Sequence, residues 1–166
     1  MSTYFFSSNS DYLLCLRGMH QLHALAVVGQ DQTDEANRIR AQMEQIWWNL
    51  PETEQERLDG LSEDLYTLSD EPWKPSPTTP EAKLLQEQFD HAVQTGNWDE
   101  ALNSLRLVAH FLEPAAVSTL RGSIWQSAGD PETAELFFEH SAHGPRNGQS
   151  DPAKWPLFPG QIEVPQ

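Results

Sequence analysis

Two short stretches decide the fold of this chain: GNWDEA at residues 96–101 and GDPETA at residues 129–134, an offset of 33 residues. In each stretch the glycine ends one helix and permits a tight turn, and the alanine lets two antiparallel helices approach closely. Four residues after each alanine comes a large apolar residue, Leu105 or Phe138, which fills the space between the helices. The internal repeat therefore predicts two helical hairpins in the second half of the chain.

Apolar residues recur at spacings of three and four through the rest of the chain, which is typical of amphipathic helices. In the third expected helix, for example, the apolar stripe is Leu58, Leu61, Leu65 and Leu68. No segment alternates with period two over the length of a strand. The expected fold class is all-α, with antiparallel helical hairpins in a short solenoid or bundle. The expected helices cover about residues 10–28, 34–50, 51–68, 81–95, 97–111, 115–128 and 131–143.

Prolines divide the chain into parts. Residues 69–80 (SDEPWKPSPTTP) hold four prolines, which cannot continue a helix and favour an extended, stiff connector. Within this linker we expect Trp73 to lie against a neighbouring helix, because an exposed indole wastes apolar area. The expected organisation is a three-helix region over residues 1–68, the linker, two hairpins over residues 81–143 and an irregular, proline-rich tail over residues 144–166.

The tail carries a candidate anchor of three large apolar residues, Trp155, Leu157 and Phe158, within four positions. These side chains either dock the tail on the body of the protein or form a short anchor for a partner. Docking is the favoured interpretation, because exposed apolar clusters are uncommon on monomeric proteins.

The stretch Gly96–Ala101 resembles the turn and small-residue core of a tetratricopeptide repeat. The second copy is also similar to that family before its turn, with Gly122 at the small position and Trp125 at the aromatic one. In the first copy these two positions hold Phe89 and Ala92. The two copies of the repeat, and with them the resemblance, cover about residues 82–144.

Tetratricopeptide repeats usually bind peptides or protein surfaces in a concave groove, so the resemblance implies a groove lined by the first helix of each hairpin. Only Lys83 matches the basic cluster with which some family members clamp a C-terminal carboxylate, so a chaperone-tail receptor is not expected. The candidate groove residues are polar and nearly uncharged: Lys83, Gln86, Asp90, Gln94, Thr119, Ser123 and Gln126.

The chain is strongly acidic, with 25 Asp and Glu against 10 Lys and Arg and a formal net charge of −15. Nucleic acids and anionic membranes would be repelled, so direct binding to either is not expected. Glu52, Glu56, Asp59 and Glu63 fall at helical spacing on one face. This acidic face is a solvated surface, a docking face for a basic protein, or a mimic of nucleic-acid charge that occupies a basic protein's binding site.

No nucleophile-elbow, phosphate-loop, dinucleotide or zinc-protease motif occurs in the sequence, and no cofactor is expected. Two histidine pairs at helical i, i+3 spacing, His20 with His23 and His140 with His143, leave open a small metal-dependent enzyme. The single cysteine, Cys15, excludes an internal disulfide, and a buried, inert thiol is the expected state.

The leading hypothesis from the sequence is a non-catalytic helical-repeat module or adaptor that binds another protein or peptide. Its apolar stretches are too short to span a bilayer and its start lacks the basic residues of a secretory signal, so a cytoplasmic location is expected. Homodimerisation through the open end of the repeat stack stays open. For the adjacent Trp47 and Trp48, burial inside the fold is favoured over a ligand-stacking role.

Overall fold

A computed structural model describes residues 9–143, and over that range the chain forms α-helices and one 3-10 turn without any strand. The all-α fold class is therefore confirmed. Within the same range, no helix is both long enough and apolar enough to cross a membrane. The elements are α1 (Ser10–Val27), α2 (Asp34–Trp47), α3 (Glu52–Thr67), α4 (Pro80–Thr95), α5 (Trp98–Val108), η1 (Ala109–Phe111), α6 (Pro114–Ser127) and α7 (Pro131–His143).

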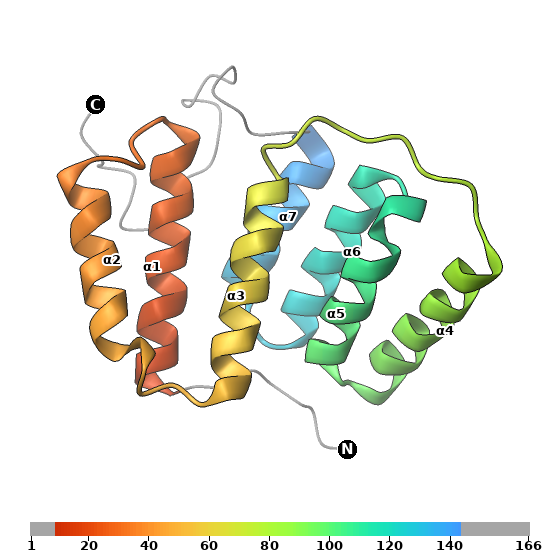
Figure 1. Cartoon of the computed structure of the whole chain (residues 1–166), viewed down its shortest axis with the longest axis horizontal. Helices are drawn as coiled ribbons and strands as arrows, with labels where there is room; N and C mark the ends of the chain where they lie inside the picture. The colour runs from red at the N-terminus through yellow and green to blue at the C-terminus, as the bar shows by residue number, and fades with distance from the viewer. Residues whose placement is uncertain (1–8, 144–166) are drawn as a thin grey trace. The chain divides into compact units, whose positions relative to one another are not determined.

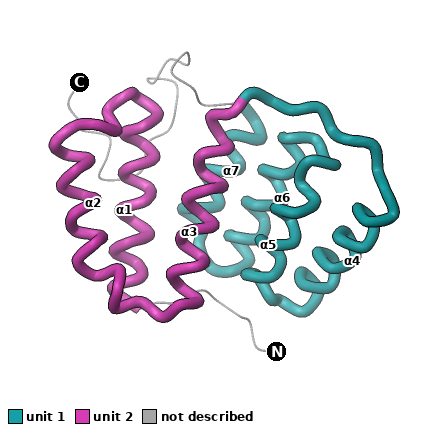
Figure 2. Tube along the Cα trace, in the orientation of Figure 1, with its two compact units in different colours: residues 1–6, 71–145 teal, residues 7–70, 146–166 magenta. Residues whose placement is uncertain are grey.

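The chain divides into two compact units, shown in Figure 2. The N-terminal unit holds α1, α2 and α3, and the C-terminal unit holds residues 71–79 followed by α4 to α7. Each unit has its own set of packed helices.

In the N-terminal unit, α1 lies between α2 and α3 and packs against both (Figure 1). Leu25 of α1 forms a buried cluster with Ala36 and Ile39 of α2. The apolar stripe expected on α3 is confirmed in full, because Leu58, Leu61, Leu65 and Leu68 are all buried. Burying each leucine stabilises the unit by about 1.5–3 kcal/mol.

In the C-terminal unit, each helix packs against the next along the chain, α4 on α5, α5 on α6 and α6 on α7. The two glycines of the internal repeat have left-handed backbone conformations, with φ of 72° at Gly96 and 91° at Gly129. Both glycines stand where one helix ends and the next begins, as the repeat predicts. The two alanines of the repeat, Ala101 and Ala134, are fully buried between their helices.

Helices α6 and α7 approach closely where Gly122 of α6 meets Phe138 of α7. A Cβ atom on Gly122 would lie 2.5 Å from Cε1 of the Phe138 ring, which is well inside van der Waals contact. Only a glycine lets the ring cross the α6 backbone at this distance. Trp125, one turn further along α6, is completely buried.

The proline-rich segment before α4 is fastened to the turn between α5 and α6. The indole Nε1–H of Trp73 donates to the carbonyl of Leu112 at 2.9 Å, and the backbone N–H of Ser76 donates to the carbonyl of His110 at 2.8 Å. Trp73 was expected to lie against a neighbouring helix, but its hydrogen-bond partner is the carbonyl of Leu112, in the turn between η1 and α6. The expected helix over residues 97–111 is wrong in its last turn, because α5 ends at Val108 and a 3-10 turn follows. The carbonyls of His110 and Leu112 accept hydrogen bonds from the proline-rich segment and not from a further turn of α5.

The expected burial of Trp48 is wrong, because this side chain is 77% exposed. Trp48 is the capping residue just past the end of α2 and keeps helical backbone angles, so it lies about 100° around the helix axis from the half-buried Trp47, on the exposed side. Leu50 in the same turn is buried.

Asp130 begins α7. One carboxylate oxygen accepts the backbone N–H of Thr133 at 3.1 Å, and the other accepts the Thr133 hydroxyl at 2.6 Å. Burial raises the pKa of the Asp130 carboxyl above its ordinary value, against the smaller, lowering effect of these two hydrogen bonds. Asp130 therefore stabilises the helix start as an acceptor while its negative charge is partly desolvated.

We expect Gly122→Val to destabilise the C-terminal unit by about 1–3 kcal/mol, because the added side chain overlaps the Phe138 ring. The measurement is the free energy of unfolding in urea, with Ser123→Val on the exposed face of α6 as the matched control. The same Gly122→Val change should cost less in a Phe138→Ala background. An equal cost in both backgrounds would exclude the ring as the cause.

We expect Asp130→Ala to cost about 1 kcal/mol, whereas Asp130→Asn keeps the accepting oxygen. A raised folded-state pKa means that the contribution of this carboxyl to stability is present below the pKa of the unfolded chain and is lost as the pH rises through the folded-state pKa. Urea unfolding should therefore favour Asp130→Asn over the parent chain more at about pH 7 than at about pH 4. An Asn variant as unstable as the Ala variant at both pH values would contradict this account of the cap.

Candidate functional site

The N-terminal unit contains a cavity of about 290 Å³ that opens to solvent, and all three of its helices line it. The size is close to the lower end for sites that take a small ligand or a few side chains of a partner. We call this cavity the α1–α3 groove. The residues that line it include Met19, Leu22, His23 and Ala26 of α1, Arg40 and Met43 of α2, Ser62, Leu65 and Tyr66 of α3, and Ser69 just after α3.

The floor of the groove is one face of α1. Positions 19, 22, 23 and 26 follow the spacing of three and four that places residues on the same side of a helix. Met19 and Leu22 are only partly buried, so apolar surface is left uncovered by α2 and α3. Met43 adds a second flexible thioether, and such side chains adapt to apolar ligands of different shape.

A positive charge stands at the edge of the groove. The Arg40 guanidinium donates from Nη2 to the backbone carbonyl of Asp31 at 2.7 Å and from Nη1 to the amide oxygen of Asn37 at 3.0 Å. Both acceptors are neutral, but Asp31 itself also lines the cavity, so this edge holds one basic and one acidic residue. These two hydrogen bonds use two of the five N–H groups of the guanidinium.

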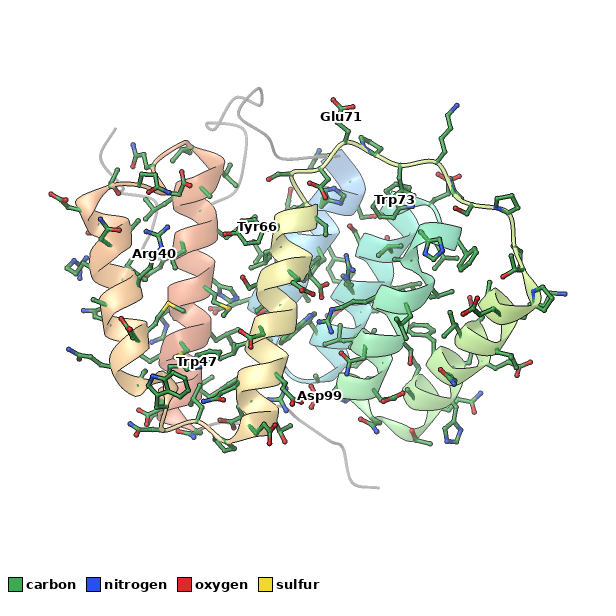
Figure 3. All side chains as sticks on the ribbon, in the orientation of Figure 1. Arg40, Trp47, Tyr66, Glu71, Trp73 and Asp99 are labelled. Carbon is green, nitrogen blue, oxygen red and sulfur yellow. The ribbon has the colours of Figure 1, made fainter. Side chains whose placement is uncertain are left out.

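An aromatic ring forms the opposite edge. Tyr66 lines the groove from α3 and is 76% exposed, which is unusual for so large an apolar surface. Figure 3 shows the Tyr66 side chain reaching from α3 toward α1, and Arg40 reaching toward α1 from the α2 side. The groove thus has an apolar floor between one edge that holds Arg40 and Asp31 and one aromatic edge.

The acidic face lies on α3 in line with Tyr66. All four of its carboxylates are exposed. Tyr66 follows Glu63 by three positions and Asp59 by seven, so the row of acidic side chains leads along the helix to the edge of the groove. Helix α3 therefore contributes both the aromatic edge and the acidic face. The four residues are Glu52, Glu56, Asp59 and Glu63.

The structure places the residues expected to line a repeat groove on α4 and α6, mostly exposed to solvent. On α4, the amide of Gln86 donates to the carboxylate of Asp90 at 3.3 Å. On α6, the hydroxyl of Thr119 lies 2.6 Å from that of Ser141 on α7, so it is turned toward the neighbouring helix. The exposed positions are Lys83, Asp90 and Gln94 on α4 and Thr119, Ser123 and Gln126 on α6, while Gln86 is partly buried.

The two histidine pairs lie in different environments. His140 is buried, and its Nδ1 lies 2.6 Å from the hydroxyl of Ser118. His143 is exposed, and its Nε2 lies 3.3 Å from the carboxylate of Glu139. In the other pair, His20 is buried whereas His23 lines the groove. Over residues 9–143, no group of three or more His, Cys, Asp or Glu side chains is arranged to hold a metal ion.

The contact between Ser118 and His140 has the residue types of a nucleophile and base, but its burial argues for a structural role. Ser118 is 2% exposed and His140 is 7% exposed, so a substrate could not reach the hydroxyl without opening α6 from α7. The pair joins the two helices of the second hairpin by a buried hydrogen bond.

Cys15 is fully buried in α1, as expected from the sequence. Burial raises the pKa of the Cys15 thiol, and the nearby Asp11 carboxylate raises it further. The thiol group lies 3.9 Å from the carbonyl of Met43. A buried thiol with a raised pKa suits packing between α1 and α2 and not nucleophilic chemistry.

The groove could not be found from the sequence. His23 was singled out only as half of a histidine pair, and Met19, Leu22 and Met43 fit the helical spacing of apolar residues that is typical of a core. Arg40 and Tyr66 carried no signal of their own. The expected tail anchor of Trp155, Leu157 and Phe158 lies outside the described residues.

Comparisons with protein-family models, with curated proteins and with solved structures return no match to this chain.

Proposed function

We propose that this protein is a non-catalytic helical module that binds another protein, and that the α1–α3 groove is its principal contact site. The observation that carries the proposal is the uncovered apolar floor of the groove beside an exposed tyrosine. Concave apolar surfaces with a few polar groups at the edge are the usual form of a binding site. Tyrosines at such edges are frequent anchors of protein interfaces.

The charge of α3 indicates which kind of partner fits. A segment with large apolar side chains would occupy the floor, and basic residues next to it would lie along the acidic face. The partner class is therefore a protein segment in which Lys or Arg flanks an apolar anchor. The resemblance of α4 to α7 to tetratricopeptide repeats supports the same general role, because that family usually binds proteins.

The groove has a matched control within the same unit. Tyr66 and Trp48 are both large aromatic residues, 76% and 77% exposed, but only Tyr66 lines the groove. We expect Tyr66→Ala to weaken binding of the captured partner by about 2 kcal/mol, roughly thirty-fold in Kd, as for an interface anchor. Trp48→Ala should leave the Kd unchanged.

The experiment captures partners on the immobilised full chain and measures the Kd of each captured protein against the parent chain, Tyr66→Ala and Trp48→Ala. Unfolding in urea checks that both variants keep the stability of the parent, because both side chains are exposed. A partner that binds all three chains equally would place its contact outside the groove and contradict the proposal.

The acidic face should govern how fast the partner arrives. We expect replacement of its four carboxylates by Gln or Asn to slow association by about ten-fold at low salt, with little difference at high salt. Stopped-flow mixing with the captured partner measures the rate constant. The matched control replaces four exposed glutamates elsewhere, Glu44, Glu81, Glu87 and Glu135, and changes the net charge equally. Equal slowing in both variants would leave only a net-charge effect and no role for this face.

A further inference from the structure

We propose that, in the free protein, the α1–α3 groove is occupied by the chain's own segment Lys154–Phe158. The sequence KWPLF at residues 154–158 places a basic residue directly before three large apolar side chains. This is the chemistry that the apolar floor and the acidic face of α3 accept. In this proposal the chain's own segment fills the groove until a partner binds there.

The floor supplies the first half of the match. Met19 and Leu22 of α1 and Met43 of α2 line a cavity of about 290 Å³, which is room for a few side chains and not for a whole helix. A short anchor such as Trp155 with Leu157 suits this size better than a long amphipathic helix does. The thioethers of Met19 and Met43 can adjust to an indole ring, and contacts between sulfur and aromatic rings are favourable.

Charge supplies the second half of the match. A docked Trp155 beside Tyr66 would place Lys154 next to the row that ends in Asp59 and Glu63. Both carboxylates are exposed and lie on the same face of α3 as Tyr66. The chain has only 10 basic residues against 25 acidic ones, so a lysine immediately before an apolar anchor is a specific feature.

The tether makes the docking intramolecular. Ten residues separate His143, at the end of α7, from Lys154, and they span up to roughly 35 Å when extended. A tether that spans the distance to the groove gives an effective concentration in the millimolar range, so a weak contact is then enough to fill the groove.

The methionines provide a direct test, because the chain has three of them and two line the groove. The full chain is labelled with ¹³C at the methionine methyl groups, and its spectrum is compared with that of a triple variant, Trp155→Ala, Leu157→Ala and Phe158→Ala. We expect the Met19 and Met43 methyl resonances to move on removal of the Trp155 ring current. Nuclear Overhauser contacts should join the Trp155 indole to at least one of these methyls in the full chain.

The control variant removes two apolar side chains elsewhere in the tail, Ile162→Ala with Val164→Ala, and should leave the methyl resonances in place. Identical Met19 and Met43 resonances in the full chain and the triple variant would overturn the proposal. A dependence of the resonances on protein concentration would also overturn it, because the segment would then come from a second copy.

Docking of the segment needs no partner. Its competition with a partner for the groove, however, rests on the proposed function. A partner that uses the groove must displace the segment, so the triple variant should bind it more tightly than the full chain does. Failure of the methyl experiment leaves the Tyr66 comparison intact. The opposite result is also informative. If the methyl resonances move in the triple variant but Tyr66→Ala leaves the Kd of the partner unchanged, the proposed function is rejected and the docking of the segment still holds.

Discussion

The close packing of α1 against α2 at Gly18 is the contact on which the groove and the N-terminal unit depend. A Cβ atom at this position would lie 2.7 Å from the sulfur of Met43, so any larger residue would displace the Met43 side chain from this contact. With glycine, Met43 crosses the α1 backbone, and Ile39 reaches the buried cluster around Leu25. The helix pair is then fixed by packing, and the next face of α1, from Met19 to Ala26, is left as the floor of a groove.

The C-terminal unit uses the same device. Gly122 of α6 lets the Phe138 ring of α7 approach its backbone, much as Gly18 admits Met43. In both pairs a small residue on one helix faces a large one on the other, which sets the distance between the axes. The two contacts differ in how well the side chains next to them are covered. Around Gly122, Trp125 is completely buried and Ser118 bonds to His140 between the helices, whereas beside Gly18 the face at Met19 and Leu22 is only partly covered.

The helices and their starts could be predicted from the sequence because their signals are local. Thr79 accepts the backbone N–H of Ala82 at 3.1 Å, Asp130 caps α7, and Gly96 turns between α4 and α5 as its neighbours indicate. The groove could not be predicted, because it depends on how much of Leu22 its neighbours leave uncovered. Trp48 was misjudged because one step along a helix turns the side chain by about 100°, which is enough to move it from the buried side to solvent. The hydrogen bond of Ser118 with His140 needs the register of two helices, which no local pattern contains.

In the proposed function, the acidic face attracts a basic segment of a partner and the groove holds its apolar anchor. Hydrogen exchange, followed by mass spectrometry, tests this most directly when the free protein is compared with its complex with a captured partner. The account predicts added protection in residues 19–27 of α1 and in residues 62–69, the end of α3 and the two residues after it, where the groove lies. Protection confined to residues 83–94 and 119–126, the outer faces of α4 and α6, would contradict it and place binding in the C-terminal unit.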